Sequence, residues 1–99
     1  MLPRISGILA CLAVSSGAAL AQSPAPPAGA ASCSGCHANS KSVDTPVPRL
    51  QGRSAAEIAA AMQAFKSGAR PATIMDRIAK GFTDPQSQAI ADWYAAQKN

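Results

Sequence analysis

The sequence predicts an all-α fold of three or four short helices. Two amphipathic stretches with capping residues favour helices, and no stretch shows the alternation expected of a strand. Hydrophobic residues make up 47% of the 99 residues, but only 4% are aromatic, and alanine dominates. Because alanine buries little area, one domain of this length needs a disulfide, a metal or a bound cofactor to complete its core. The composition excludes a two-domain enzyme and a repeat array.

Residues 1–21 are predicted to form a secretory signal peptide. Arg4 supplies the positive start, residues 5–20 form an apolar run, and Ala19–Ala21 provide an A-x-A cleavage pattern. Two alternatives stay open, an uncleaved membrane anchor and a lipid-modified Cys11. The apolar run is short for a span and is interrupted by glycine and serine. We therefore expect cleavage, a periplasmic location and no stable membrane insertion afterwards.

Residues 22–30 form a Pro/Ala-rich leader that cannot continue a helix. The remaining residues, 31–99, are predicted to form the single functional domain. With the signal peptide removed, Cys33 and Cys36 are the cysteines that remain. Thiols rarely stay free in an oxidising compartment, so this pair is expected to be used chemically.

The segment Cys33–His37 reads C-x-x-C-H, the attachment signature of c-type haem. The spacing puts both sulfur atoms on one side of a helical turn, where they can add to the two vinyl groups on one porphyrin edge. The adjacent His37 then becomes an axial ligand of the iron. We expect one covalently bound haem c and no catalytic residue.

Three other interpretations of this motif were weighed. Cys33 and Cys36 could form a structural disulfide with His37 incidental. A thioredoxin-like dithiol requires a βαβ context, which the sequence lacks. A zinc site requires more ligands than these three contiguous residues supply. The export signal ahead of the motif favours haem.

An amphipathic helix is predicted over Ser54–Lys66. Ser54 followed by Glu57 forms a capping box, and Gly68 supplies a stop. One face carries apolar side chains at helical spacing: Ala55, Ile58, Met62 and Phe65.

The second axial ligand is predicted to be a methionine, since His37 is the only histidine. Met62 lies on the apolar helix face, where core packing explains it. Met75 follows the turn-rich residues 68–72, in which Pro71 disfavours helix. We therefore predict Met75 as the ligand and keep Met62 as the alternative.

The last helix is predicted to start at Asp84, with Pro85 in its first turn, and to run to about Lys98. The tryptophan and the tyrosine share one face of this helix with two other residues, and the four are Ile90, Trp93, Tyr94 and Gln97. We expect the two aromatic rings to pack on the first helix or on the wall of the haem site.

Over about residues 31–96 the chain resembles class I cytochromes c. Residues 48–52 (PRLQG) are similar to the P-x-L-x-G segment of short bacterial members. The resemblance implies that the Pro48 carbonyl accepts a hydrogen bond from the His37 imidazole, with Pro46 as the fallback. Residues 65–70 (FKSGAR) resemble the F-x-x-G-x-R stretch ahead of the methionine ligand, which supports Met75.

Residues 70–82 most closely resemble the haem subunit of flavocytochrome c sulfide dehydrogenase. The resemblance implies an FAD-containing flavoprotein partner that oxidises sulfide, while the cytochrome passes electrons onward one at a time. Two alternatives remain: a free soluble electron carrier between respiratory complexes, and a haem sensor with an open iron position.

The chain departs from this pattern at two places. Ala38 and Asn39 follow the motif where glycine is common, and Gly29 stands where an aromatic residue often precedes the first cysteine. We therefore expect a short first helix with a weakened contact to the last one.

The formal net charge is +4. A basic surface steers acidic redox partners, and Arg49, Arg53 and Arg70 are candidates to pair with haem propionates. Because the charges are dispersed and aromatic platforms are missing, nucleic-acid binding is not expected.

Overall fold

The computed structural model describes residues 25–97, together with Pro3 and Gly17. The rest of the predicted signal peptide, residues 22–24 of the leader and Lys98 lie outside the described residues. The helices are α1 (Ala30–Cys33), α2 (Ala55–Ser67), α3 (Met75–Lys80) and α4 (Asp84–Ala96). Residues 25–97 contain no strand, so the all-α prediction is confirmed. No helix in this part of the chain is long and apolar enough to cross a membrane.

Helix α2 begins directly after the predicted cap, Ser54, and ends at Ser67, one residue beyond the predicted end at Lys66. The Ser54 hydroxyl accepts a hydrogen bond from the Glu57 backbone N–H at 3.0 Å. Gly68 follows the last residue, Ser67, with φ 81°, a left-handed conformation that glycine adopts at little cost. The face predicted to be apolar buries Ile58 and Met62.

Helix α4 starts at Asp84 as predicted, but its cap is Thr83. The Thr83 hydroxyl accepts from the Gln86 backbone N–H at 3.3 Å, and the Gln86 side chain accepts from the Thr83 N–H at 2.9 Å. This reciprocal capping box satisfies two backbone donors that the helix itself leaves without partners.

Helix α1 has only four residues, as the sequence predicts. Gly29, which precedes it, has φ 85°, and the ring of Phe82 packs directly against it. A Cβ atom added to Gly29 would lie 2.5 Å from the Phe82 ring. An aromatic side chain from the segment between α3 and α4 thus covers the start of the first helix.

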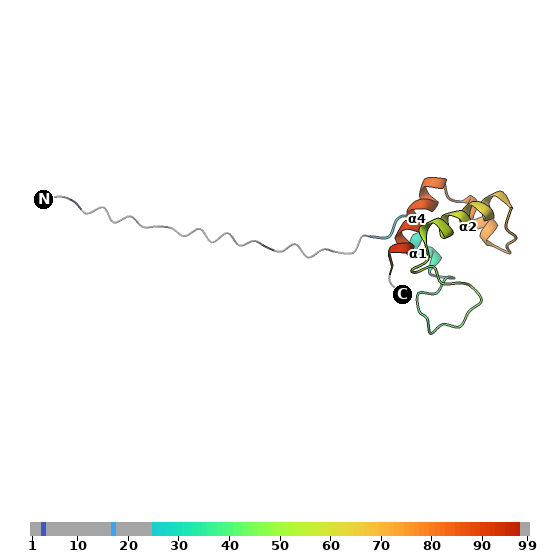
Figure 1. Ribbon diagram of the computed structural model, residues 1–99, viewed down its shortest axis with the longest axis horizontal. Helices are drawn as coiled ribbons and strands as arrows, with labels where there is room; N and C mark the ends of the chain where they lie inside the picture. Colours follow the sequence, from blue (N-terminus) through green and yellow to red (C-terminus); the bar gives the residue numbers. More distant parts are fainter. Residues whose placement is uncertain (1–2, 4–16, 18–24, 98–99) are drawn as a thin grey trace.

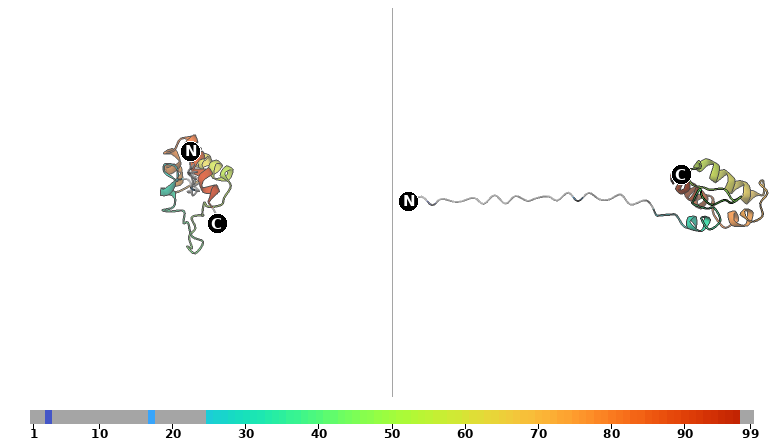
Figure 2. Two further views of the ribbon diagram at one scale, coloured as in Figure 1. Left: turned by 90° about the vertical axis from the view of Figure 1, so that its left-hand side faces the viewer. Right: turned by 90° about the horizontal axis from the view of Figure 1, so that it is seen from below.

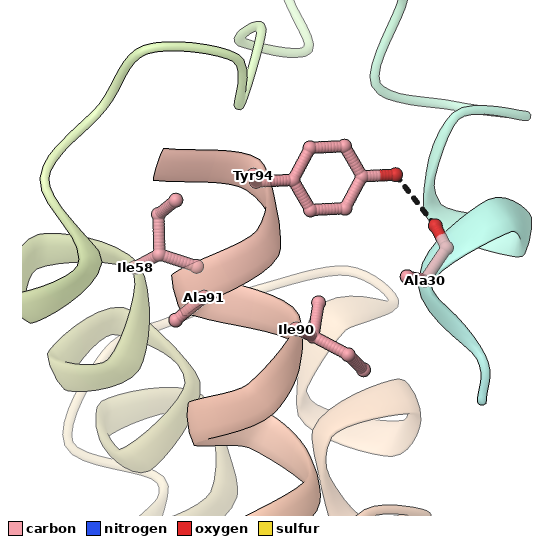
Figure 3. Close-up of a cluster of buried hydrophobic side chains, with 5 residues drawn as sticks. All are labelled: Ala30, Ile58, Ile90, Ala91 and Tyr94. Atoms are coloured by element: carbon pink, nitrogen blue, oxygen red, sulfur yellow. Dashed lines mark hydrogen bonds between the residues drawn. The ribbon is translucent and has the colours of Figure 1, made fainter. Parts of the chain in front are cut away.

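The core is a small cluster in which one aromatic ring dominates (Figure 3). Tyr94 is the largest fully buried side chain, and its hydroxyl donates to the Ala30 carbonyl at 2.5 Å. Trp93 meets the Tyr94 ring edge-on, with ring centroids 4.9 Å apart. Tyr94 therefore packs against the first helix, as predicted. The cluster comprises Ala30, Ile58, Ile90, Ala91 and Tyr94.

Helix α2 packs against both α3 and α4. Figure 2 shows α1 in teal and α2 in yellow-green on opposite sides of the helical body. The chain between α1 and α2 forms a long loop that extends away from the helices (Figure 1). The Lys66 ammonium donates to the Phe82 carbonyl at 2.7 Å and joins α2 to the segment between α3 and α4.

Candidate functional site

The C-x-x-C-H motif forms a helical turn that continues α1. The backbone N–H groups of Cys36 and His37 donate to the Cys33 carbonyl at 3.2 Å and 2.8 Å. Cys33 is half-buried, Cys36 is exposed, and both thiols are free. Burial raises the pKa of the Cys33 thiol, and the nearby Cys36 adds to this effect. The turn therefore carries two cysteines and a histidine at the edge of the helical body.

The His37 ring is oriented by a single contact. Its Nδ1 atom lies 2.6 Å from the carbonyl oxygen of Pro48. A carbonyl oxygen only accepts hydrogen bonds, so Nδ1 carries the proton and the Nε2 lone pair is left available for a metal. Pro48, rather than the fallback Pro46, makes the contact that the resemblance implies. The ligand role of His37 itself stays a prediction.

A cavity of about 150 Å³ lies beside this turn. Cys33, His37 and Pro48 contribute to one part of its lining, and α2, α3 and α4 contribute mostly apolar side chains. Predicted site residues that are far apart in the sequence therefore border one space. The residues that these helices and their connections contribute are Leu50, Arg53, Glu57, Ile58, Ala61, Met62, Phe65, Arg70, Met75, Ile78, Phe82 and Ile90.

Both candidate methionines line this cavity. Met62 is buried in the middle of α2, in agreement with its predicted place on the apolar face. Met75 is half-buried and is the first residue of α3, a helix start that is not predicted from the turn-rich residues 68–72 ahead of it. The choice of Met75 as ligand stays a prediction.

The three candidate arginines have different positions. Arg53 and Arg70 line the cavity, and the Arg70 guanidinium lies 4.9 Å from the ring centroid of Phe65. Arg49 instead donates to the backbone carbonyl of Asn39 at 2.8 Å. Two of the three are thus placed to meet acidic groups of a molecule in the cavity.

Sequence reasoning missed two contributors to this cavity. Glu57 was interpreted only as part of a helix cap, yet it also lines the cavity. Phe82 lines the cavity and covers Gly29, a pairing that depends on the tertiary fold. The sequence signal for Phe82 is the spacing of four residues from Ile74 to Ile78 and from Ile78 to Phe82, which sets the three beside Met75.

The residues at this site fit a c-type haem. The porphyrin faces need apolar contacts, and the aliphatic and aromatic lining offers them. The iron needs an imidazole of fixed tautomer, which the contact between His37 and Pro48 supplies. The half-buried Cys33 and the exposed Cys36 suit an edge of the ring that lies near the surface.

Two curated proteins are similar in sequence to this chain. One is the cytochrome subunit of sulfide dehydrogenase from Chlorobaculum tepidum, 36% identical over 63 residues, which cover 64% of this chain and 57% of the relative. The other is the thiosulfate dehydrogenase electron acceptor of Thiomonas intermedia, 41% identical over 73 residues, which cover 70% of this chain and 34% of that protein. The chain is similar to small cytochromes c.

These relatives confirm the resemblance to a small cytochrome c close to the sulfide dehydrogenase subunit. The matched part of this chain covers only a part of each relative, about half of the first and a third of the second. No known family model matches the sequence.

Proposed function

We propose that this chain is a c-type cytochrome that carries single electrons on one covalently bound haem c. The observation that supports it most is the wall of one apolar cavity, in which Cys33, His37 and Met75 meet. The names of both relatives, a cytochrome subunit and an electron acceptor, support the same function. Residues 31–99 form the cytochrome domain in this proposal, after a signal peptide over 1–21 and a leader over 22–30.

Each residue of the site has a distinct role in the proposal. Cys33 and Cys36 would hold the haem through thioether bonds, and His37 and Met75 would be the protein ligands of its iron. A bound haem supplies the Fe(III)/Fe(II) couple. The Pro48 carbonyl fixes the His37 ring, and the weak thioether donor of Met75 favours ferrous iron and raises the potential. The apolar lining keeps water from the iron.

We further propose that the electron donor is an FAD-containing dehydrogenase in the periplasm, with sulfide as its substrate. Two exposed apolar side chains flank Met75, Ile74 at 57% and Ile78 at 37% exposure. Arg77 and Lys80 lie in the last turn of the same short helix, and Asp76 lies in its first turn. Exposed apolar side chains with charged neighbours are typical of a surface that docks a protein, and the excess of basic side chains on this helix favours an acidic partner.

A free electron carrier is the second candidate. The name of the relative from Thiomonas intermedia, an electron acceptor of thiosulfate dehydrogenase, favours a cytochrome that receives electrons from a sulfur-oxidising enzyme. Purification of the native protein separates the two candidates. A permanent subunit co-purifies with a protein that contains FAD, whereas a carrier elutes alone as a monomer.

Haem attachment and ligation are tested on protein expressed with a haem-maturation system. The intact mass should include one haem, and the ferric spectrum should show the long-wavelength charge-transfer band of methionine ligation. Met75→Ala should lose this band, while Met62→Ala should keep it. A colourless wild-type protein would overturn the haem proposal, and carbon monoxide binding to the ferrous wild type would overturn Met75 ligation in favour of the sensor.

A further inference from the structure

Asn39 lies two residues after His37, where several polar contacts converge. Its backbone carbonyl accepts a hydrogen bond from the Arg49 guanidinium at 2.8 Å. Its side-chain amide is hydrogen-bonded to the side-chain amide of Gln51, which is buried. Arg49 and Gln51 are one and three residues beyond Pro48. The chain that leaves the motif is therefore joined to the chain that carries Pro48 at two points next to His37.

The same amide also contacts the motif itself. The Ser34 hydroxyl, inside C-x-x-C-H, lies 3.0 Å from Oδ1 of Asn39. Ser34 Oγ is in turn 2.9 Å from the hydroxyl of the buried Tyr94. Through these contacts the Asn39 side chain is connected to α4 and to the core. The Asn39 side chain is thus linked through Ser34 to a buried side chain, although Asn39 itself is exposed.

The position of Pro48 needs such support. Pro48 ends the loop that extends from the helical body, and residues 40–44 and 46 of that loop are exposed (Figures 1 and 2). Closing a loop costs conformational entropy, so a contact across its base offsets part of this cost. The contacts of Asn39 with Arg49 and Gln51 lie at that base, on the residues that follow Pro48.

We propose that Asn39 is a positioning residue that holds the Pro48 carbonyl against the His37 imidazole. In this role Asn39 touches neither the iron nor the haem. It fixes the distance between the chain that follows the histidine and the chain that follows the proline, so the hydrogen bond between Nδ1–H and the Pro48 carbonyl persists. The consequence for electron transfer, a fixed orientation and basicity of the His37 ligand, rests on the proposed function.

Hydrogen exchange of the His37 Nδ1–H, followed by NMR on the haem-loaded protein, tests this proposal. His37 is the only histidine, so its signals are assigned without ambiguity. Asn39→Ala removes the amide contacts but keeps the backbone carbonyl that binds Arg49. We expect the Nδ1–H to exchange about three- to tenfold faster, which corresponds to the loss of one net hydrogen bond. Gln51→Ala should accelerate exchange similarly, because it removes the other half of the same contact.

Two comparisons make the test specific. Ser42→Ala, in the same loop, removes a hydroxyl that contacts only Ser40 among the hydrogen bonds seen here, and should leave the exchange rate unchanged. The double variant Asn39→Ala/Gln51→Ala should exchange no faster than Asn39→Ala alone, since that substitution already removes the contact with Gln51 as well as the contact with Ser34. Additive effects, or wild-type exchange in Asn39→Ala, would overturn the proposal.

The failure of this proposal can be told apart from failure of the proposed function. The absorption spectrum and the mass report haem attachment before any exchange is measured. If the wild-type protein carries no haem, the proposed function fails. The ¹⁵N shifts of the His37 imidazole in the apoprotein then still report whether Nδ1 carries the proton in wild type and loses its hydrogen bond in Asn39→Ala.

Discussion

The cluster around Tyr94 and the cavity share two residues, Ile58 and Ile90. On the cluster side these isoleucines contact protein atoms, and the ring of Tyr94 fills the space between α1 and α4 (Figure 3). On the cavity side they border an open volume. Helices α2 and α4, which carry Ile58 and Ile90, therefore have one surface that is covered by other side chains of the protein and one that borders the cavity.

The polar contacts of the two regions differ in the same way. The Tyr94 hydroxyl is bonded to Ala30, and its backbone carbonyl accepts from the Gly52 N–H at 3.2 Å. The cluster is thus stabilised from within the chain. The cavity is bordered by the His37 imidazole and the Cys33 side chain, and in the proposed function a bound haem supplies their partners. We infer that the stability of the cavity side depends on the cofactor.

Loss of the haem attachment should have the largest effect. In the double variant Cys33→Ser/Cys36→Ser the thioether bonds cannot form, and the apolar cavity wall is left exposed to water. We expect a loss comparable with the whole unfolding free energy of a small domain, about 5 kcal/mol or more. Thermal unfolding followed by circular dichroism would show a broad transition or none. A cooperative transition near that of the wild type would show that the chain completes its own core.

Met62→Ala should have the next largest effect. Met62 is buried within α2 and borders the cavity, so its truncation enlarges the space beside the haem. The expected cost is about 2–5 kcal/mol of unfolding free energy, measured by denaturant unfolding. Because Met62 is not the predicted ligand, the ferric charge-transfer band should persist. Loss of that band would assign the ligand role to Met62 instead.

Tyr94→Phe changes the buried cluster around Tyr94 and should lower the free energy of unfolding by less than Met62→Ala does. The substitution keeps the ring but removes the hydroxyl that bonds the Ala30 carbonyl and contacts Ser34. Leaving a buried carbonyl without its partner costs about 1–3 kcal/mol. The same denaturant measurement checks this value, and the haem spectrum should not change. A spectral change would show that the two regions are coupled through the motif turn.

Much of the fold was predictable because local signals agreed with it. Ser54, Glu57 and Gly68 set the limits of α2 by backbone chemistry that acts within a few residues. The start of α4 at Asp84 was predictable from Asp84 and Pro85, whereas its cap, Thr83, is identified only by the reciprocal contact with Gln86. The packing of Phe82 on Gly29 joins segments that are far apart in sequence, and no periodicity predicts it.

For the candidate site, the local turn was predictable from the sequence, and the contacts between distant segments were not. The C-x-x-C-H spacing predicted one turn carrying both cysteines and His37, and that turn is present. The sequence could not predict that both methionines border the cavity, because this depends on how α2 and α3 pack. Arg49 was considered for the haem propionates on its charge alone. In the structure the Arg49 guanidinium donates to the Asn39 carbonyl across the loop, and this contact cannot be predicted from the charge of Arg49.

The smallest expected effect comes from a contact outside both regions. Gln63 and Lys66 of α2 hydrogen-bond the carboxylate of Asp84 at 2.7 Å and 3.2 Å, and these contacts lower the pKa of Asp84 below its usual value. A carboxylate with a lowered pKa stabilises the fold above the pKa of the unfolded chain. That stabilisation disappears as the pH falls through the folded pKa. Thermal stability should therefore decrease below about pH 4.

Asp84→Asn isolates this contribution from that of the other carboxylates. The amide can still accept from Gln63 but carries no charge, so the variant should be less stable than the wild type at neutral pH. The difference in Tm should shrink as the pH decreases, because the wild-type carboxylate becomes protonated and also loses its charge. The pair is exposed to solvent, with 67% of the Asp84 side chain accessible, so added salt should reduce the difference at neutral pH. A difference that stayed constant from neutral to acidic pH would mean that the contact between α2 and α4 depends on the hydrogen bonds and not on the charge.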